Sequence, residues 1–147
     1  MPDTSRQSAS GYDLSPLSPE ERKAREATLT ADERRVLLNS GTEMPFCGGH
    51  LKNKSPGVFV CRLCELPLFR SKSKFESGTG WPSFFEPFDP EHVATVRDTS
   101  HGMTRVEIRC ARCGGHLGHV FEDGPAPTGQ RYCVNSASLG FKDTGEA

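Results

Sequence analysis

The stretch Cys61-Arg-Leu-Cys64 and its echo Cys110-Ala-Arg-Cys113 decide the fold of this chain. Two C-x-x-C pairs supply four thiolates, which is the ligand set of a tetrahedral structural zinc site. The pairs are separated by the 45 residues from 65 to 109, so the metal would connect distant parts of one domain. Because four protein ligands close the site, we expect a structural zinc ion. Iron is the alternative, since the same four-thiolate geometry can hold it.

The bulk composition is that of a single domain with a small apolar core. The chain has 147 residues, of which 34% are hydrophobic, and a net charge of −1. A bound metal is typical where little apolar area can be buried, because metal binding adds to the free energy of folding. The near-neutral charge gives no electrostatic reason to expect a nucleic-acid partner.

The chain carries no sequence signal for a membrane or for secretion. No apolar run reaches the roughly 20 residues needed to cross a bilayer, and Met1–Tyr12 is polar, without the hydrophobic region of a signal peptide. We therefore expect a cytoplasmic protein with no membrane partner. We also expect the protein to be a monomer. Thiols stay reduced in that compartment, which disfavours two structural disulfides and favours metal or redox chemistry.

Two helices are predicted near the N-terminus. Ser18 precedes a proline and two acids, the order that begins a helix. Thr30 and Glu33 form a capping-box pattern for a second helix, which we expect Gly41 to end. The predicted domain organisation is a disordered segment 1–14, a single domain 15–142 with a helical annex 15–40 and a zinc-stapled β core 41–142, and a tail 143–147.

The rest of the chain reads as short strands separated by turns. Apolar and β-branched runs bounded by turn residues are typical of strands, whereas the proline- and glycine-rich residues 123–129 predict a loop. These patterns favour a mostly antiparallel β domain. The predicted strands cover residues 57–61, 66–69, 92–98, 103–110, 117–121 and 130–134.

Cys133 lies outside the two C-x-x-C pairs and is the candidate nucleophile. A reactive cysteine needs nearby cations or donors that favour its thiolate. Arg131 and Asn135 lie two residues to either side, so in a strand their side chains share a face with Cys133. The alternative is a buried cysteine that acts as a small hydrophobic residue.

Two histidines and one tryptophan complete the candidate site. His116 and His119 offer imidazoles that titrate near neutral pH, with zinc ligation or surface polarity as the alternatives. Trp81, the only tryptophan, follows Gly78 and Gly80 in the sequence and lies close to Phe84, Phe85 and Phe88. It is either ordinary core or the wall of an apolar pocket for a methyl or thioether group, since sulfur has an affinity for aromatic rings.

Taken together, these motifs resemble methionine sulfoxide reductase B. The resemblance covers roughly residues 15–142 in the family's motif order. It rests on Gly41-Thr42-Glu43, the paired C-x-x-C units, Ser77-Gly78-Thr79-Gly80-Trp81-Pro82-Ser83-Phe84, Ser100-His101-Gly102-Met103, Gly114-Gly115-His116-Leu117-Gly118-His119-Val120-Phe121 and Arg131-Tyr132-Cys133-Val134-Asn135-Ser136.

The resemblance implies a fold, a reaction and residue roles. The fold would be two packed antiparallel sheets with a zinc remote from the active site, and the reaction would be reduction of the R epimer of methionine sulfoxide. Cys133 would be the nucleophile and Trp81 would pack on the substrate methyl group. The sulfoxide pocket would contain His116, His119 and Asn135, with Asp123, Arg131 and Phe121 assigned to substrate binding.

One position departs from the commonest family pattern. Many members carry a resolving cysteine two residues before the pocket tryptophan, where this chain has Thr79. Cys47, in a glycine-rich stretch, resembles the resolving cysteine of a subgroup that carries it in an N-terminal loop. The resemblance then implies a Cys133 sulfenic acid, a Cys47–Cys133 disulfide and reduction by thioredoxin or a similar dithiol. The alternative is that Cys47 is incidental and an external thiol acts instead.

The rival function is a non-catalytic, zinc-stabilised binding domain of the same general fold. Such a domain would keep both C-x-x-C pairs but would have no reason to hold Cys133 among His116, His119 and Asn135. The enzyme hypothesis also predicts its partners, which are oxidised proteins bearing methionine (R)-sulfoxide and a dithiol reductant.

Overall fold

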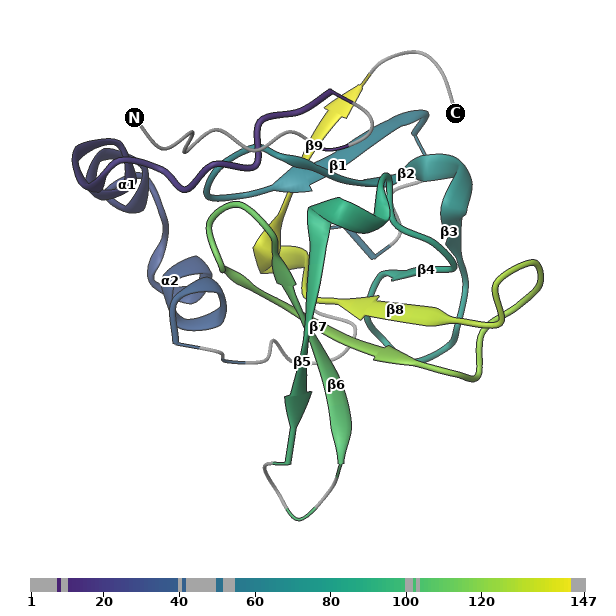
Figure 1. Ribbon diagram of the computed structural model, residues 1–147. Coiled ribbons are helices and arrows are strands. Elements are labelled where there is room, and N and C mark those ends of the chain that lie inside the picture. Colours follow the sequence, from purple (N-terminus) through teal and green to yellow (C-terminus); the bar gives the residue numbers. More distant parts are fainter. Residues whose placement is uncertain are drawn as a thin grey trace.

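The computed structural model describes residues 8, 11–39, 41, 50–51, 55–99, 102 and 104–143 of the chain. This part consists of two antiparallel sheets with two short helices beside them (Figure 1), which confirms the predicted fold class. The elements are α1 (Pro19–Glu26), α2 (Ala31–Leu37), β1 (Gly57–Cys61), β2 (Pro67–Arg70), β3 (Lys74–Phe75), β4 (Ser83–Phe84), β5 (Val93–Asp98), β6 (Arg105–Cys110), β7 (His116–Phe121), β8 (Arg131–Val134) and β9 (Leu139–Asp143), with short 3-10 turns η1 (Ser71–Ser73), η2 (Pro90–His92) and η4 (Ser136–Ser138).

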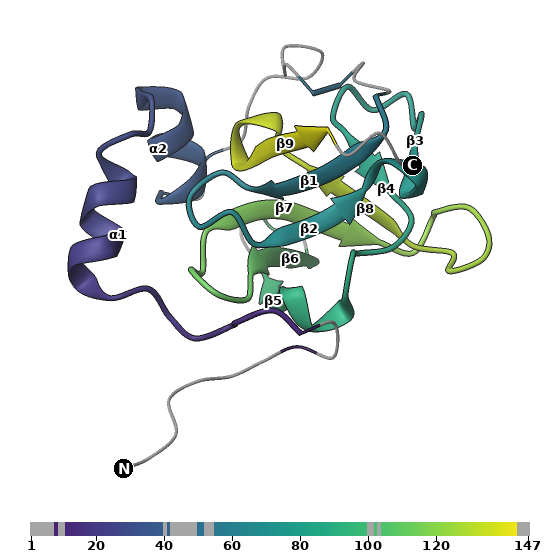
Figure 2. The ribbon, with the colours of Figure 1, turned by 90° about the horizontal axis from the view of Figure 1, so that it is seen from above.

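The two sheets differ in size and lie against each other. The small sheet has the strand order β2-β1-β9, and the large sheet has the order β3-β4-β8-β7-β6-β5. Figure 2 shows the small sheet lying over the large one. After β8 the chain passes through η4 and returns to the small sheet as β9, which pairs with β1 over its whole length. The last strand therefore joins the two layers.

Aromatic rings from both sheets form the centre of the core. Phe59 of β1 and Phe69 of β2 meet Phe84 of β4, and all three are fully buried. The Phe69 and Phe84 rings stack at 4.4 Å, and the Phe59 ring meets Phe84 edge-on at 5.2 Å. Burial of such a side chain contributes about 1.5–3 kcal/mol each. These contacts fix the large sheet against the small one.

Both helices begin where the caps predict. The Ser18 hydroxyl accepts a hydrogen bond from Glu21 N, and Thr30 and Glu33 form a complete capping box. Such caps stabilise a helix by about 1 kcal/mol each. The second helix ends at Leu37, earlier than the expected stop at Gly41. No described helix has the length and apolarity needed to cross a membrane.

The helices dock on the two C-x-x-C turns. Arg22 of α1 donates to the carbonyl of Cys113 at 2.7 Å. Arg62, inside the other C-x-x-C unit, pairs with Glu33 of α2 at 2.9 Å. The helical annex therefore covers the end of the β core where the cysteines gather.

Part of the segment expected to be disordered packs against the β core. Within residues 1–14, the structure describes residue 8 and residues 11–14. Leu14 is only 2% exposed, and the Tyr12 ring meets the rings of Phe88 at 5.6 Å and His92 at 5.4 Å. The buried His92 ring also bonds to the Ser8 hydroxyl at 2.7 Å. These contacts place residues 11–14 with the domain and differ from the expectation of disorder there.

Each of the six predicted strands is present, with its described boundaries shifted by at most two residues. The two-residue strands β3 and β4 and the closing strand β9 were not predicted. Residues 123–129 form no helix or strand, as expected for the predicted loop.

Candidate active site and metal centre

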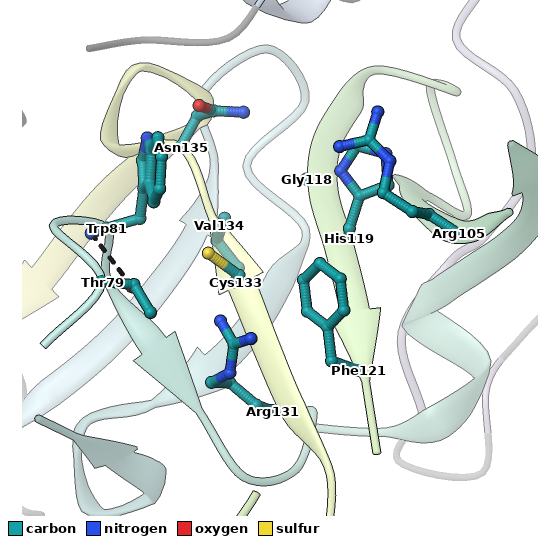
Figure 3. Close-up of a pocket in the computed structure, with 10 residues that line it drawn as sticks. All are labelled: Thr79, Trp81, Arg105, Gly118, His119, Phe121, Arg131, Cys133, Val134 and Asn135. Atoms are coloured by element: carbon teal, nitrogen blue, oxygen red, sulfur yellow. Dashed lines mark hydrogen bonds between the residues drawn. The ribbon is translucent and has the colours of Figure 1, made fainter. Parts of the chain in front are cut away.

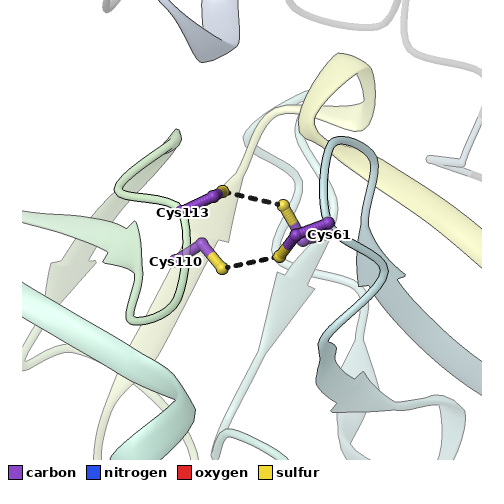
Figure 4. Close-up of side chains that lie close together, drawn as sticks. Cys61, Cys110 and Cys113 are labelled. Atoms are coloured by element: carbon purple, nitrogen blue, oxygen red, sulfur yellow. Dashed lines mark hydrogen bonds between the residues drawn. The ribbon is translucent and has the colours of Figure 1, made fainter. Parts of the chain in front are cut away.

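The four cysteines of the C-x-x-C pairs form one buried cluster that can hold a metal ion. All their sulfur atoms lie within 4.8 Å of one another. The Sγ–Sγ distance is 3.5 Å between Cys61 and Cys113 (Figure 4) and 3.4 Å between Cys64 and Cys110. A tetrahedron with Zn–S bonds of about 2.3 Å has S–S edges of about 3.8 Å. The donor set and spacing therefore fit a four-coordinate zinc ion with no open position.

The two turns that carry these cysteines have the same backbone geometry. Glu65 N donates to Cys61 O at 2.8 Å, and Gly114 N donates to Cys110 O at 2.8 Å. The residue after the second cysteine is left-handed in both turns, with φ of 65° at Glu65 and 74° at Gly114. Glycine accepts this conformation without strain, whereas glutamate does not. Each turn thus contributes two thiols to the buried cluster.

A separate cavity of about 240 Å³ opens over strands β7 and β8. Figure 3 shows Cys133 in the middle of this pocket, with Trp81 on one side and His119 and Phe121 on the other. None of its lining residues belongs to the cysteine cluster. They are Thr79, Trp81, Arg105, Gly118, His119, Phe121, Arg131, Cys133, Val134 and Asn135.

Strand register brings the reactive side chains together. His119 pairs with Cys133, and Phe121 pairs with Arg131, across β7 and β8. Directly opposed residues of an antiparallel pair share a face and have neighbouring side chains. The imidazole and the thiol therefore occupy adjacent positions on the pocket face of the large sheet.

An irregularity in β7 places a second histidine on that face. Ile108 pairs with Gly118, but Arg109 pairs with His116, so Leu117 is an extra residue in β7. In a regular strand, residues three apart point to opposite faces. The bulge lets His116 and His119 lie together, with ring centroids 5.7 Å apart, while Leu117 is fully buried in the core.

Each histidine is held by a carboxylate that is itself held by an arginine. His119 Nε2 lies 2.8 Å from Asp98 Oδ2, and Arg105 Nη2 donates to the same oxygen at 3.2 Å. His116 Nδ1 lies 2.6 Å from Glu107 Oε2. Two arginine–carboxylate–histidine chains thus run side by side across β5, β6 and β7.

In the chain from Arg109 through Glu107 to His116, the carboxylate and the imidazole are buried, whereas the Arg109 side chain is 40% exposed. The Arg109 guanidinium donates hydrogen bonds to both carboxylate oxygens of Glu107, at 2.8 and 3.1 Å. Burial alone would raise the pKa of Glu107, but the hydrogen bonds from Arg109 and His116 bring it below its usual value. Burial also lowers the pKa of His116, against the opposing effect of Glu107. His116 is 4% exposed, and its Nε2 has no hydrogen-bond partner among the described residues.

Arg131 is fixed on the other side of Cys133. Its guanidinium makes a two-point contact with Asp123, at 2.9 and 3.2 Å, and lies over the Phe121 ring at 4.5 Å. The hydrogen bond to Asp123 raises the pKa of Arg131, and the proximity of Cys133 adds to the effect. A permanently charged group is thus held two residues from the thiol, on the same face of β8.

Asn135 follows β8 and is locked by its own amide. It is 3% exposed, and its Nδ2 donates to Leu117 O at 3.1 Å while its backbone N donates to the same oxygen at 2.9 Å. The rigid amide lines the pocket beside Cys133.

The structure gathers most of the residues that the sequence singled out. Six of the predicted site residues line the pocket, and Asp123 holds Arg131 at its rim with 66% of its side chain exposed. His116 is not among the lining residues and lies beside His119. Cys47 lies outside the described residues. The six are Cys133, His119, Asn135, Trp81, Arg131 and Phe121.

Sequence reasoning missed the two carboxylates and one arginine. Asp98, Arg105 and Glu107 sit on the β5–β6 hairpin, where Arg105 and Glu107 alternate with apolar residues. That alternation reads as an ordinary solvated face. Only the pairing of β6 with β7 reveals that this face borders the histidines.

Comparison with known proteins supports one family. The SelR domain model matches residues 29–143. The chain is 62% identical to a peptide methionine sulfoxide reductase MsrB of Caulobacter vibrioides over 145 residues, covering 99% of this chain and 91% of the relative. It is 60% identical to the MsrB of Xylella fastidiosa strain M23 over 134 residues, covering 91% and 86% of the two chains.

A third relative, matched over a shorter region, is also an MsrB. The MsrB of Escherichia coli O45:K1 is 59% identical over 108 residues, which cover 74% of this chain and 79% of that protein. The matched region includes the domain that carries both the cysteine cluster and the Cys133 pocket. The chain is therefore a member of the MsrB family of peptide methionine sulfoxide reductases.

Proposed function

We propose that the chain reduces methionine (R)-sulfoxide in proteins, with Cys133 as the nucleophile. The observation that carries this proposal is the pairing of Cys133 with His119 at the centre of one pocket. A thiol and an imidazole at neighbouring positions supply the nucleophile and the proton that reduction of a sulfoxide needs. The choice of the R epimer rests on the family resemblance.

The pocket favours a reactive thiolate and an apolar methyl group. Arg131, fixed by Asp123, brings a positive charge to the Cys133 side of the pocket, and a nearby cation favours the thiolate. Trp81 and Phe121 provide aromatic surface on opposite sides of Cys133 (Figure 3). Aromatic rings attract sulfur and its methyl substituent, so these rings suit the thioether end of the substrate.

The proposed step consumes one thiolate and one proton. The Cys133 thiolate attacks the sulfoxide sulfur and forms a sulfur–sulfur bond, while the pocket imidazolium gives a proton to the oxygen. The resulting hydroxyl group then passes from the substrate sulfur to the Cys133 sulfur as the sulfur–sulfur bond breaks. Methionine leaves as the thioether, reduced by two electrons, and Cys133 keeps the oxygen as a sulfenic acid, oxidised by two electrons. Atoms and charge balance in this sum. We assign the proton to His119, because His119 lines the pocket and His116 does not.

Regeneration of the thiol needs a second sulfur. The described cysteines are the four of the cluster and Cys133, and the cluster thiols are reserved for metal in this proposal. Thr79 occupies the pocket position where many family members carry a resolving cysteine. We therefore propose that Cys47 condenses with the sulfenic acid to a disulfide, which thioredoxin or a similar dithiol reduces by exchange.

The cluster is proposed to hold one structural zinc ion. Cys61, Cys64, Cys110 and Cys113 would be its ligands. Zinc supplies no chemistry to the reaction in this proposal, because all four positions are filled by protein.

Turnover of the two sulfoxide epimers tests the function. A dabsylated methionine of each configuration is supplied with the protein and reduced thioredoxin. Reduction of the R epimer alone is the expected result, and preference for the S epimer would contradict the proposal. Rapid, selective modification of Cys133 by iodoacetamide in the metal-loaded protein is the companion result. A thiol no more reactive than that of a buried structural cysteine would instead support the non-catalytic domain.

A further inference from the structure

The β5–β6 hairpin contacts His119, which lines the pocket, through the carboxylate of Asp98. Asp98, the last residue of β5, pairs in register with Arg105, the first residue of β6. Its Oδ2 accepts from Arg105 at 3.2 Å and lies 2.8 Å from His119 Nε2. The Asp98 and His119 side chains are 17% and 13% exposed. This contact is therefore shielded from most solvent competition.

The chemistry of the carboxylate fixes the proton on the ring. An ionised carboxylate has only acceptors, so His119 must carry hydrogen on Nε2 to make this bond. The ring nitrogen that remains for the substrate is then Nδ1. When the imidazolium gives its Nδ1 proton to a sulfoxide oxygen, the neutral ring that results is the Nε2–H tautomer. That tautomer is the one that the bond to Asp98 stabilises.

We propose that Asp98 is a positioning residue for sulfoxide reduction, which holds the His119 ring and its Nε2–H tautomer so that Nδ1 serves the pocket. The proposal rests on the proposed function of Cys133 and His119. Arg105 fixes the carboxylate in turn, because it occupies the cross-strand position opposite Asp98 and also lines the pocket. A ring free to rotate would spend time in orientations that cannot deliver the proton, and misplacement lowers the rate of the chemical step.

The hydrogen-bonded chain Arg109–Glu107–His116 does not substitute for the hydrogen-bonded chain Arg105–Asp98–His119. Glu107 bonds to Nδ1 of His116, the opposite ring nitrogen. That ring is buried and is not among the residues that line the pocket. The two hydrogen-bonded chains thus hold their imidazoles by different ring nitrogens. Only the chain through Asp98 leaves the Nδ1 atom of a pocket-lining histidine available.

The test compares Asp98→Asn and Asp98→Ala with Glu91→Gln in the full-length, metal-loaded protein. Glu91 is an exposed acid just before β5, so its variant controls for loss of a negative charge near the hairpin. The first readout is the rate of methionine formation in a single turnover, at increasing concentrations of an R-sulfoxide peptide. We expect Asp98→Asn to be slower by roughly tenfold to a hundredfold at saturation. The half-saturating peptide concentration should stay unchanged, because the change affects only the reacting state.

The second readout is the tautomer of His119, read from long-range ¹H–¹⁵N NMR correlations of the reduced protein without substrate. The parent and Glu91→Gln should show the Nε2–H form, and Asp98→Ala should show a smaller fraction of that form. A parent-like single-turnover rate in both Asp98 variants, or an unchanged tautomer in Asp98→Ala, overturns the proposal. If the parent itself reduces neither epimer, the proposed function fails, while the NMR result still decides whether Asp98 holds the ring.

The melting temperature and the zinc content of each variant show whether the variant folds as the parent does. If Asp98→Ala does not fold, both readouts are measured on Asp98→Asn, which preserves the shape of the side chain. Asp98→Asn with parent-like rate and parent-like tautomer then overturns the proposal.

Discussion

The sulfur atoms of Cys61 and Cys113 lie 3.5 Å apart, although Cys61 ends a strand of the small sheet and Cys113 follows a strand of the large one. A metal bound there would join the two layers directly. The same end of the domain carries the helices, since Arg22 of α1 bonds to the Cys113 carbonyl. Loss of the metal should therefore loosen the sheets and the helical annex together.

Cys61→Ser or Cys113→Ser should release the metal and lower the melting temperature by more than about 10 °C, because the binding energy of a structural zinc is folding energy. Metal analysis and thermal unfolding of the same samples check this. Cys133→Ser is the matched control, since it removes a thiol outside the cluster. A cluster variant that melts like the parent without metal would show that the site is not structural.

Cys133→Ser should reduce turnover below about a hundredth of the parent rate while metal content and melting temperature stay unchanged. A hydroxyl at this position lacks the nucleophilicity of a thiolate at neutral pH. The measurement is methionine formation with thioredoxin as the reductant. Higher residual activity would mean that another group performs the attack.

His119→Gln and His116→Gln should differ in their effects. His119 lines the pocket opposite Cys133, so its loss should slow sulfenic acid formation about a hundredfold, the usual contribution of a positioned acid. His116 is not among the lining residues, and its replacement should slow the same step by less. Single-turnover rates at saturating substrate decide the order. A larger loss in His116→Gln would reassign the proton donor.

Cys47→Ser should give one stoichiometric burst of methionine and then stop when thioredoxin is the only reductant. Cys133 would remain as sulfenic acid, because Thr79 cannot form a disulfide. The double variant Cys47→Ser with Thr79→Cys should recover thioredoxin-driven turnover, since position 79 lines the same pocket as Cys133. Cys47→Ser with Thr79→Val is the matched control and should not recover it. Full turnover in Cys47→Ser alone would contradict the assignment.

The free energy of unfolding should fall between pH 6.5 and pH 5.5 because of His116. Its pKa in the folded protein is lowered by burial, whereas in the unfolded chain it is about 6.5. Below pH 6.5 the unfolded chain binds a proton that the folded protein excludes, so stability falls as the pH falls. Urea unfolding at both pH values should show a smaller loss in His116→Gln.

Glu107 acts in a separate pH window. Its folded pKa is also lowered, so its contribution is fully present above its unfolded value of about 4.3. The contribution is lost only as the pH falls through the lower folded pKa. Measurements above pH 5 therefore separate the contribution of His116 from that of Glu107, provided that metal content is checked in each sample. An equal loss of stability in the parent and in His116→Gln would rule out this origin.

Much of the fold was predictable because its signals are local. A cap at Thr30 acts on the backbone three residues away, and each C-x-x-C turn closes within a few residues. Alternation of apolar residues marked the long strands. The two-residue strands β3 and β4 and the closing strand β9 escaped prediction, because pairing with distant segments, as in β9 with β1, defines them more than their own residues do.

The sequence by itself determined which residues could react. Residue type and spacing singled out Cys133, the two histidines and the four cluster cysteines. The resemblance of these motifs to a known family then indicated the reaction. Local pattern could not decide where those side chains point. His116 and His119 would lie on opposite faces of a regular strand, and only the extra residue Leu117 in the pairing of β7 with β6 brings both rings together.

The tertiary structure alone decided which groups hold the histidines. Asp98 lies 21 positions before His119 and meets it only because β5, β6 and β7 are neighbours in one sheet. Strand register is set by the burial of apolar residues over the whole sheet, since a slip by one residue would expose the core face. The positions of Asp98 and Glu107 beside the imidazoles therefore follow from the packing of Ile108, Leu117 and Val134 on the opposite face, which no short stretch of sequence encodes.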